Sequence, residues 1–243
     1  MRRAPGSTVE RLARDLTDAT GWDAAGEELS AWLAGSPRFR VFVEAHRDKI
    51  RKKLRGAAEA EALRDVQAEL RVALLLLADR RIDLGYEAYG SGRVGPDFTV
   101  TFRATQRFNL EVTRPRRLRG AGDFGAVMAK LRQLPPSAPN AVLLAIDGES
   151  ASALDVAAAS RALRSRSDTE DAPFLAAYGF EGRREFYDRY LRLGGVFVWC
   201  DGTLGDERGA LWINRSARIP LPPSAARACL RCLQDGAASL QRP

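Results

Sequence analysis

The stretch Gly95–Pro115, GPDFTVTFRATQRFNLEVTRP, decides the fold of this chain. Apolar and polar residues alternate along both of its halves, which predicts two β-strands joined by a tight turn. The opposite face of this hairpin carries two acids, Asp97 at the start of the first strand and Glu111 near the end of the second. The apolar face consists of Phe98, Val100, Phe102, Phe108, Leu110 and Val112.

The expected register sets the distance between the two acids. With the turn centred on Thr105, Asp97 lies opposite Thr113, and Thr99 lies opposite Glu111. The two acids are then diagonal neighbours on one face, with backbones roughly 7–8 Å apart. Two carboxylates so placed can hold Mg²⁺ together with phosphate oxygens and water. The alternative is that both acids are solvent-facing positions, which two arginines on the same face favour.

The segments around the hairpin predict an α/β fold with a mixed central sheet. From residue 58 to 147 the expected order is helix, strand, strand, strand, helix, strand. The continuous apolar run at 140–147 is typical of a strand that is covered on both faces. Residues 148–243 add helices, two further strands and a closing helix. We expect one domain over 57–243.

Residues 1–56 are expected to form a separate N-terminal helical region. Ser36 and Pro37 are suited to the N-cap and the first position of a helix. Apolar residues continue at helical spacing from Phe39 to Ile50. The sequence leaves open whether these helices form a lid or the contact of a homodimer.

The net charge of +7 lies entirely in the first part of the chain. Residues 1–140 carry 25 basic and 18 acidic side chains, whereas residues 141–243 carry 13 of each. One basic cluster lies at 49–55 and a second at 114–119. Such clusters are typical of a phosphate-facing surface. A solvated helix face and an arginine-rich loop are the alternative.

Other residue types restrict the chemistry. The CxxC at 229–232 has only Cys200 and His46 as possible further ligands, and both lie far away in the sequence, so we do not expect a structural zinc site with four ligands. The histidine, His46, lies in a cationic helix without a nucleophile signature. No apolar run is long enough to cross a membrane, and the N-terminus lacks the apolar region of a secretory signal. We therefore expect a cytoplasmic protein without a membrane partner.

The hairpin and its acids resemble the PD-(D/E)xK nuclease superfamily. That motif places Pro-Asp on one strand and an acid, any residue and a lysine on the next. This chain has GPD at 95–97 and EVT at 111–113. The resemblance covers about 58–147 and implies an α-β-β-β-α-β core like that of restriction endonucleases.

The resemblance also implies roles for individual residues. Asp97 and Glu111 would bind the metal together with the carbonyl of Val112. Glu69, on the preceding helix, would be a third acid, although a plain surface glutamate is the alternative. Gln133 resembles the glutamine of RecB-type members, but the tyrosine expected four residues later is a serine.

The motif lysine is missing, because its position holds Thr113. Threonine cannot supply the positive charge that orients the attacking water and stabilises the reacting phosphate. Lys130, on the next helix, is the first candidate for a relocated lysine. Arg116 is the second and Arg114 the third, although arginine is too basic for proton transfer.

The resemblance therefore implies an endonuclease that hydrolyses nucleic acid, with DNA as the expected partner and Mg²⁺ or Mn²⁺ as the cofactor. A degenerate member that binds nucleic acid without cutting it is the first alternative, and a protein-interaction scaffold is the second, because fold does not fix function. The residues expected to contact nucleic acid are Lys49, Lys52, Lys53, Arg114, Arg116, Arg117 and Gln133.

Overall fold

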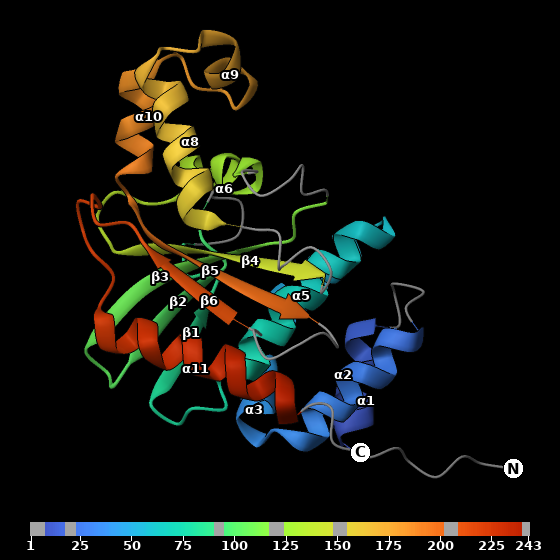
Figure 1. Ribbon diagram of the computed structural model, residues 1–243. Coiled ribbons are helices and arrows are strands. Elements are labelled where there is room, and N and C mark those ends of the chain that lie inside the picture. The colour runs from blue at the N-terminus through green and yellow to red at the C-terminus, as the bar shows by residue number, and fades with distance from the viewer. Residues whose placement is uncertain are drawn as a thin grey trace, which may run out of the picture. The chain divides into compact units, whose positions relative to one another are not determined.

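The chain divides into two compact units, Met1–Arg80 and Arg81–Pro243. The computed structural model describes residues 8–17, 23–89, 95–116, 124–147, 155–201 and 209–239 (Figure 1). Within these residues, no helix is both long and apolar enough to span a bilayer.

The described part of the first unit is helical. Apolar side chains of successive helices meet in its core, where Leu16, Leu33, Phe39 and Ile50 are all fully buried. The helices are α1 (Thr8–Thr17), α2 (Asp23–Gly35), α3 (Pro37–Ala45), α4 (Arg47–Gly56) and α5 (Ala60–Leu76).

One helix start in this unit follows the sequence prediction, and one helix break does not. Ser36 caps α3 as expected, because its Oγ accepts a hydrogen bond of 3.2 Å from the Phe39 N–H and Pro37 follows it. The apolar periodicity predicted one helix on to Ile50. Instead the helix breaks at His46, which ends α3 and precedes α4.

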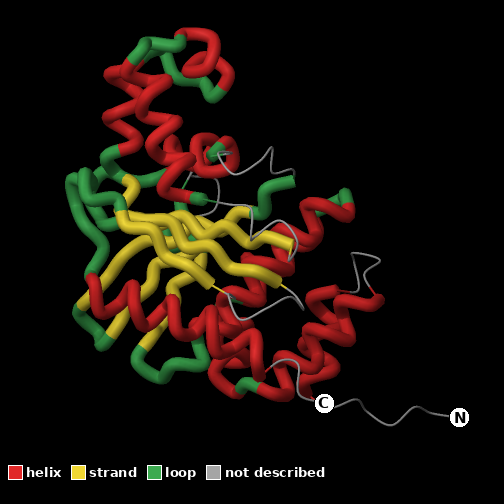
Figure 2. The backbone as a smooth tube through the Cα atoms, viewed as in Figure 1, coloured by secondary structure: helices red, strands yellow, loops and turns green. Residues whose placement is uncertain are grey.

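The second unit is built on a six-stranded mixed sheet with strand order β1-β2-β3-β4-β5-β6. The pairs β3–β4 and β4–β5 are parallel, and the other three are antiparallel. This confirms the expected α/β class and the mixed sheet, whose strands are the yellow segments of Figure 2. The strands are β1 (Ile82–Tyr86), β2 (Phe98–Phe102), β3 (Gln106–Thr113), β4 (Asn140–Asp147), β5 (Leu193–Asp201) and β6 (Gly209–Ile213).

Helices connect the parallel strands and cover both faces of the sheet. α6 (Gly125–Lys130) and the short 3-10 helix η1 (Leu131–Gln133) link β3 to β4. α8 (Val156–Asp168), α9 (Ala172–Ala177) and α10 (Arg183–Tyr190) link β4 to β5. α6 and α8 lie on one side of the sheet, and α11 (Pro223–Ser239) lies on the other (Figure 1).

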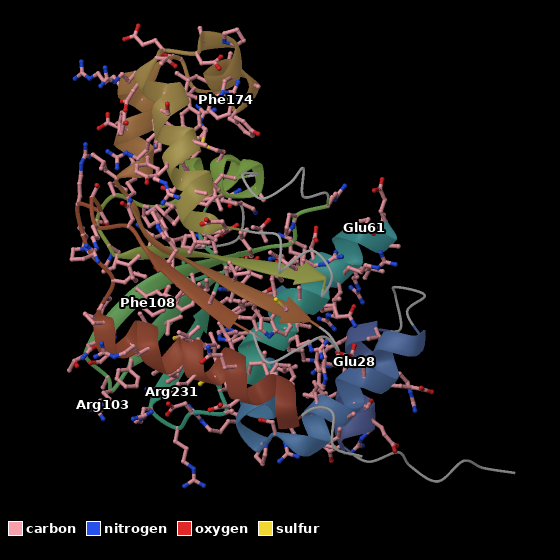
Figure 3. All side chains as sticks on the ribbon, viewed as in Figure 1. Glu28, Glu61, Arg103, Phe108, Phe174 and Arg231 are labelled. Atoms are coloured by element: carbon pink, nitrogen blue, oxygen red, sulfur yellow. The ribbon has the colours of Figure 1, made fainter. Side chains whose placement is uncertain are left out.

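The α6 side of the sheet carries a continuous apolar core. It joins Met128 of α6, Leu163 of α8 and Phe186 of α10 to Val142 and Val196 of the central strands. The α8–α10 connection extends from this core, and Phe174 lies at its end away from the sheet (Figure 3). Burial of this kind contributes about 1.5–3 kcal/mol for each large apolar side chain.

The order of elements expected over 58–147 matches the observed order, α5–β1–β2–β3–α6–β4. The division into units differs from the expected one. The compact units meet at Arg80 and Arg81 rather than at residues 56 and 57. The helix α5 therefore belongs with the N-terminal helices.

Candidate functional site

The register of the β2–β3 hairpin places its two acids closer together than expected. Phe98 pairs with Leu110, so the same register continued by one residue puts Asp97 directly opposite Glu111. Residues in that relation have Cβ atoms about 4.5–5.5 Å apart. The expected diagonal placement was wrong, because the turn centres on Ala104 rather than on Thr105.

Both acids are buried, which contradicts the alternative of solvent-facing positions. Asp97 is 8% exposed and Glu111 is 2% exposed. Glu111 pairs with Val142 of β4, and in-register residues of parallel strands share a face. Val142 belongs to the core beneath α6, so Glu111 lies on the covered face of the sheet.

The Asp97 carboxylate is fixed by the neighbouring strand. Its Oδ2 accepts a hydrogen bond of 2.9 Å from the Val112 N–H. The N–H and C=O of a strand residue point toward the same neighbouring strand. The Val112 carbonyl therefore lies on the same edge of β3 as Asp97.

Lys130 supplies a positive charge to this pair. It ends α6, and its Nζ lies 2.6 Å from Oε1 of Glu111. The lysine side chain is 26% exposed and the glutamate side chain 2%. Thr113, at the motif lysine position, is half-buried at the end of β3. The described chain thus brings together Asp97, Val112, Glu111 and Lys130.

The other predicted acid, Glu69, lies in the first unit. It is buried on α5, and its Oε2 lies 2.6 Å from Nζ of Lys53 on α4. Glu69 is therefore not the plain surface glutamate that we considered as its alternative. Lys53, which we expected at a nucleic-acid surface, instead forms an ion pair with this buried acid.

The remaining basic candidates have different surroundings. Lys52 on α4 is exposed, whereas Lys49 is half-buried. Arg116 is exposed just after β3, and Arg114 is half-buried. Arg117 lies outside the described residues.

Gln133 is half-buried at the end of η1. It follows Lys130 by three residues, so the same connection between β3 and β4 carries both predicted residues. No described contact joins Gln133 to the acids.

The sequence analysis did not single out Asn109 and Tyr89, two polar residues near the acids. Asn109 precedes Glu111 by two residues on the same face of β3 and is 2% exposed. Its amide contacts the hydroxyl of Tyr89. The signal available in the sequence was the Asn109 amide on the polar face of the hairpin. The sequence did not show that α6 buries this face.

The donor set of this site suits a hard cation only in part. Carboxylate and carbonyl oxygens are the ligands that Mg²⁺ prefers, usually with water and substrate oxygens completing the shell. In the described part of the chain, no cluster of three or more His, Cys, Asp or Glu side chains could hold a metal ion. Among the described residues, this site offers the carboxylates of Asp97 and Glu111 and the carbonyl of Val112.

Comparisons with known proteins identified no relative of this chain. No family model matches the chain, and no curated protein or solved structure is significantly similar to it. What the site can do therefore follows from its own geometry.

Proposed function

We propose that this chain is a metal-dependent nuclease of the PD-(D/E)xK type, with a restriction-endonuclease-like core to which the second unit contributes β1–β3, α6 and β4. One observation carries the proposal. Lys130 contacts the buried Glu111 at 2.6 Å, and Asp97 lies opposite Glu111, one residue before β2 begins. A lysine from another element would thus supply the positive charge that Thr113 does not.

The residues present fit a divalent cation with few protein ligands. Asp97, Glu111 and the Val112 carbonyl would hold Mg²⁺ or Mn²⁺. A bound cation would lower the pKa of water and neutralise charge on a phosphate. The Val112 N–H holds the Asp97 carboxylate in place at 2.9 Å, so this ligand is oriented in advance.

Lys130 has a role that does not depend on its own deprotonation. An ammonium group has three N–H donors, so it can contact Glu111 and a phosphate oxygen together. A fixed positive charge in a partly buried site stabilises charge that develops on the phosphate. Lys130 at the end of α6 meets both requirements.

Basic residues near the chain's surface would contact the nucleic-acid backbone without reading sequence. Lys52 and Arg116 are exposed, and Lys49 and Arg114 are half-buried. These four are the described candidates for phosphate contacts, with DNA as the proposed partner.

A catalytically degenerate nucleic-acid-binding protein is the second candidate function. Thr113 favours it, because threonine at the motif position removes the usual lysine. The Glu111–Lys130 ion pair also favours it, since a cation must compete with Lys130 for that carboxylate.

Metal titration and cleavage separate the two functions. Isothermal titration with Mn²⁺ is compared for wild type, Asp97→Asn and Glu111→Gln, and cleavage of plasmid and single-stranded DNA is followed in Mg²⁺ or Mn²⁺. The matched control is Glu170→Gln, which makes the same charge change at an exposed residue between α8 and α9. Both site variants are expected to lose metal binding and cleavage, whereas the control keeps both.

Lys130→Met and Lys130→Arg test the relocated lysine. We expect Lys130→Met to bind metal but lose most cleavage, and Lys130→Arg to retain part of it through its charge. Nucleic-acid binding without metal binding or cleavage in the wild type would reject the nuclease and leave the degenerate binder.

A further inference from the structure

An exposed aromatic ring lies beside the two acids. Tyr89 is 39% exposed, and no other aromatic side chain is among the large exposed apolar residues of the described chain. Glu87, two residues before it, donates its N–H to the Asp97 carbonyl at 2.8 Å. Tyr89 therefore lies only two residues after Glu87, the residue that hydrogen-bonds to the Asp97 backbone.

The hydroxyl of Tyr89 is held by a buried amide. Asn109 Nδ2 lies 3.1 Å from the Tyr89 hydroxyl, and Asn109 Oδ1 also accepts from Thr99 at 3.4 Å. Asn109 precedes Glu111 by two residues on one face of β3, so their Cα atoms are about 7 Å apart. The ring is therefore anchored next to the acids rather than at a distant surface.

A second amide fixes the first. Asn109 Nδ2 donates to Asn140 Oδ1 at 2.9 Å. Asn140 is fully buried, and its own Nδ2 lies within hydrogen-bond distance of the carbonyls of Pro135, Ala138 and Arg192. These carbonyls require the amide nitrogen on their side, so the oxygen must face Asn109.

Gly95 leaves room for the ring on its other side. A Cβ at Gly95 would lie 2.9 Å from Cβ of Tyr89, closer than real Cβ atoms approach, and 3.2 Å from its Cγ. The close approach of the backbone to Tyr89 therefore requires glycine. Gly95 precedes Asp97 by two residues, just as Asn109 precedes Glu111 by two. Both residues that contact Tyr89 are therefore close in sequence to an acid.

We propose that Tyr89 is a stacking platform for an unpaired nucleobase beside the phosphate held at Asp97 and Glu111. This inference rests on the proposed function for the phosphate site and adds its substrate class. A fixed, partly exposed aromatic ring stacks on any base and loses little conformational entropy on binding. A base can reach such a ring only when it has left its own helical stack.

The expected substrate is therefore single-stranded nucleic acid, or a duplex interrupted by unpaired bases. Stacking on one aromatic ring contributes enough that its loss is expected to weaken binding on the order of tenfold. Intact duplex offers no free base, so its binding is expected to depend on the basic residues alone.

The test measures binding without cleavage. Fluorescein-labelled oligothymidylate and a duplex of equal length are titrated in EDTA at one fixed salt concentration with wild type, Tyr89→Leu and Tyr89→Phe. We expect Tyr89→Leu to weaken single-strand binding about tenfold with little change for the duplex. Tyr89→Phe keeps the ring and is expected to remain within about threefold of wild type.

Two further variants report on the ring itself. Tyr89→Trp is expected to gain fluorescence quenching by oligothymidylate that wild type, with its own four tryptophans, does not show. Tyr178→Leu, which removes a half-buried tyrosine near the end of the α8–α10 connection, is the matched control and is expected to bind like wild type.

The outcomes separate this inference from the nuclease. Metal-dependent cleavage with equal single-strand binding by Tyr89→Leu would overturn the stacking platform and leave the nuclease. Loss of single-strand binding in Tyr89→Leu without any cleavage by wild type would support the platform in a degenerate binder. If wild type binds neither oligonucleotide, both proposals are overturned.

Discussion

Nζ of Lys130 lies 2.6 Å from Oε1 of Glu111, and the glutamate side chain is only 2% exposed. Lys53 and Glu69 repeat this relationship in the first unit, also at 2.6 Å and with a glutamate side chain 7% exposed. Two of the four lysines in this arginine-rich chain thus contact a buried glutamate. A buried carboxylate is costly without a nearby positive charge, so both pairs should be visible in stability measurements.

Lys130→Met is expected to lower the free energy of unfolding by about 1–3 kcal/mol, because it removes the ammonium from a buried carboxylate. Adding Glu111→Gln should recover part of this loss, since a neutral amide costs less to bury than a charge. Urea titrations of the single and double variants measure both effects. A double variant less stable than Lys130→Met alone would contradict the coupling.

Lys52→Met serves as the control for that experiment. It removes the same charge from an exposed position of α4, and its effect should stay within about 0.5 kcal/mol.

Lys53→Met is expected to destabilise the first unit more than Arg64→Met does. The Arg64–Glu61 pair is as short, at 2.5 Å, but its side chains are 58% and 38% exposed. Exposed pairs contribute about 0–1 kcal/mol, because water screens the charges. Thermal unfolding of both variants should show a clear decrease in Tm for Lys53→Met only. Equal decreases would mean that burial of Glu69 does not set the cost.

The sequence predicted the elements well where the signal is local. The cap of α3 depends only on the Ser36 hydroxyl and the N–H of Phe39, three residues later, and the structure contains this hydrogen bond. The run at 140–147 is a central parallel strand, as its apolar continuity indicated. The sequence did not predict the break at His46, because neither proline nor glycine marks it.

The hairpin register could not be read from sequence for a physical reason. Arg103 and Ala104 both take positive φ, 50° and 61°, in a turn that usually selects glycine or asparagine. Because neither glycine nor asparagine occupies these positions, the sequence does not mark which residue is the centre of the turn. Burial of Asp97 and Glu111 was also hidden, because it depends on α6 covering the polar-looking face.

Asn140→Ala is expected to lower the free energy of unfolding by about 3 kcal/mol. The fully buried amide contacts three backbone carbonyls through its nitrogen and accepts from Asn109, so its loss leaves several buried polar groups unsatisfied. Asn140→Asp should be at least as harmful, because a carboxylate faces carbonyl oxygens. Urea unfolding measures both effects. The control is Ser137→Ala, a substitution at an exposed residue of the connection before β4. A loss below about 1 kcal/mol for Asn140→Ala would contradict the role of this network.

His46 is expected to make the first unit less stable in mild acid. Burial, and secondarily the charge of Lys49, lowers the pKa of this histidine below its ordinary value of 6.5. In the unfolded chain the imidazole takes up a proton near pH 6.5, whereas the folded chain resists it until lower pH. The unfolded state therefore binds more protons in that interval, and stability falls as the pH drops below about 6.5.

His46→Gln removes this titration and keeps a polar side chain between α3 and α4. The free energy of unfolding, measured in urea from about pH 7.5 to about pH 5, should fall less for the variant than for wild type. His46 also stacks edge-on against Phe42 at 4.9 Å, so the variant can lose some stability at every pH. That constant loss leaves the slope unaffected, and parallel pH profiles for the two proteins would show that the half-buried imidazole does not titrate as its surroundings require.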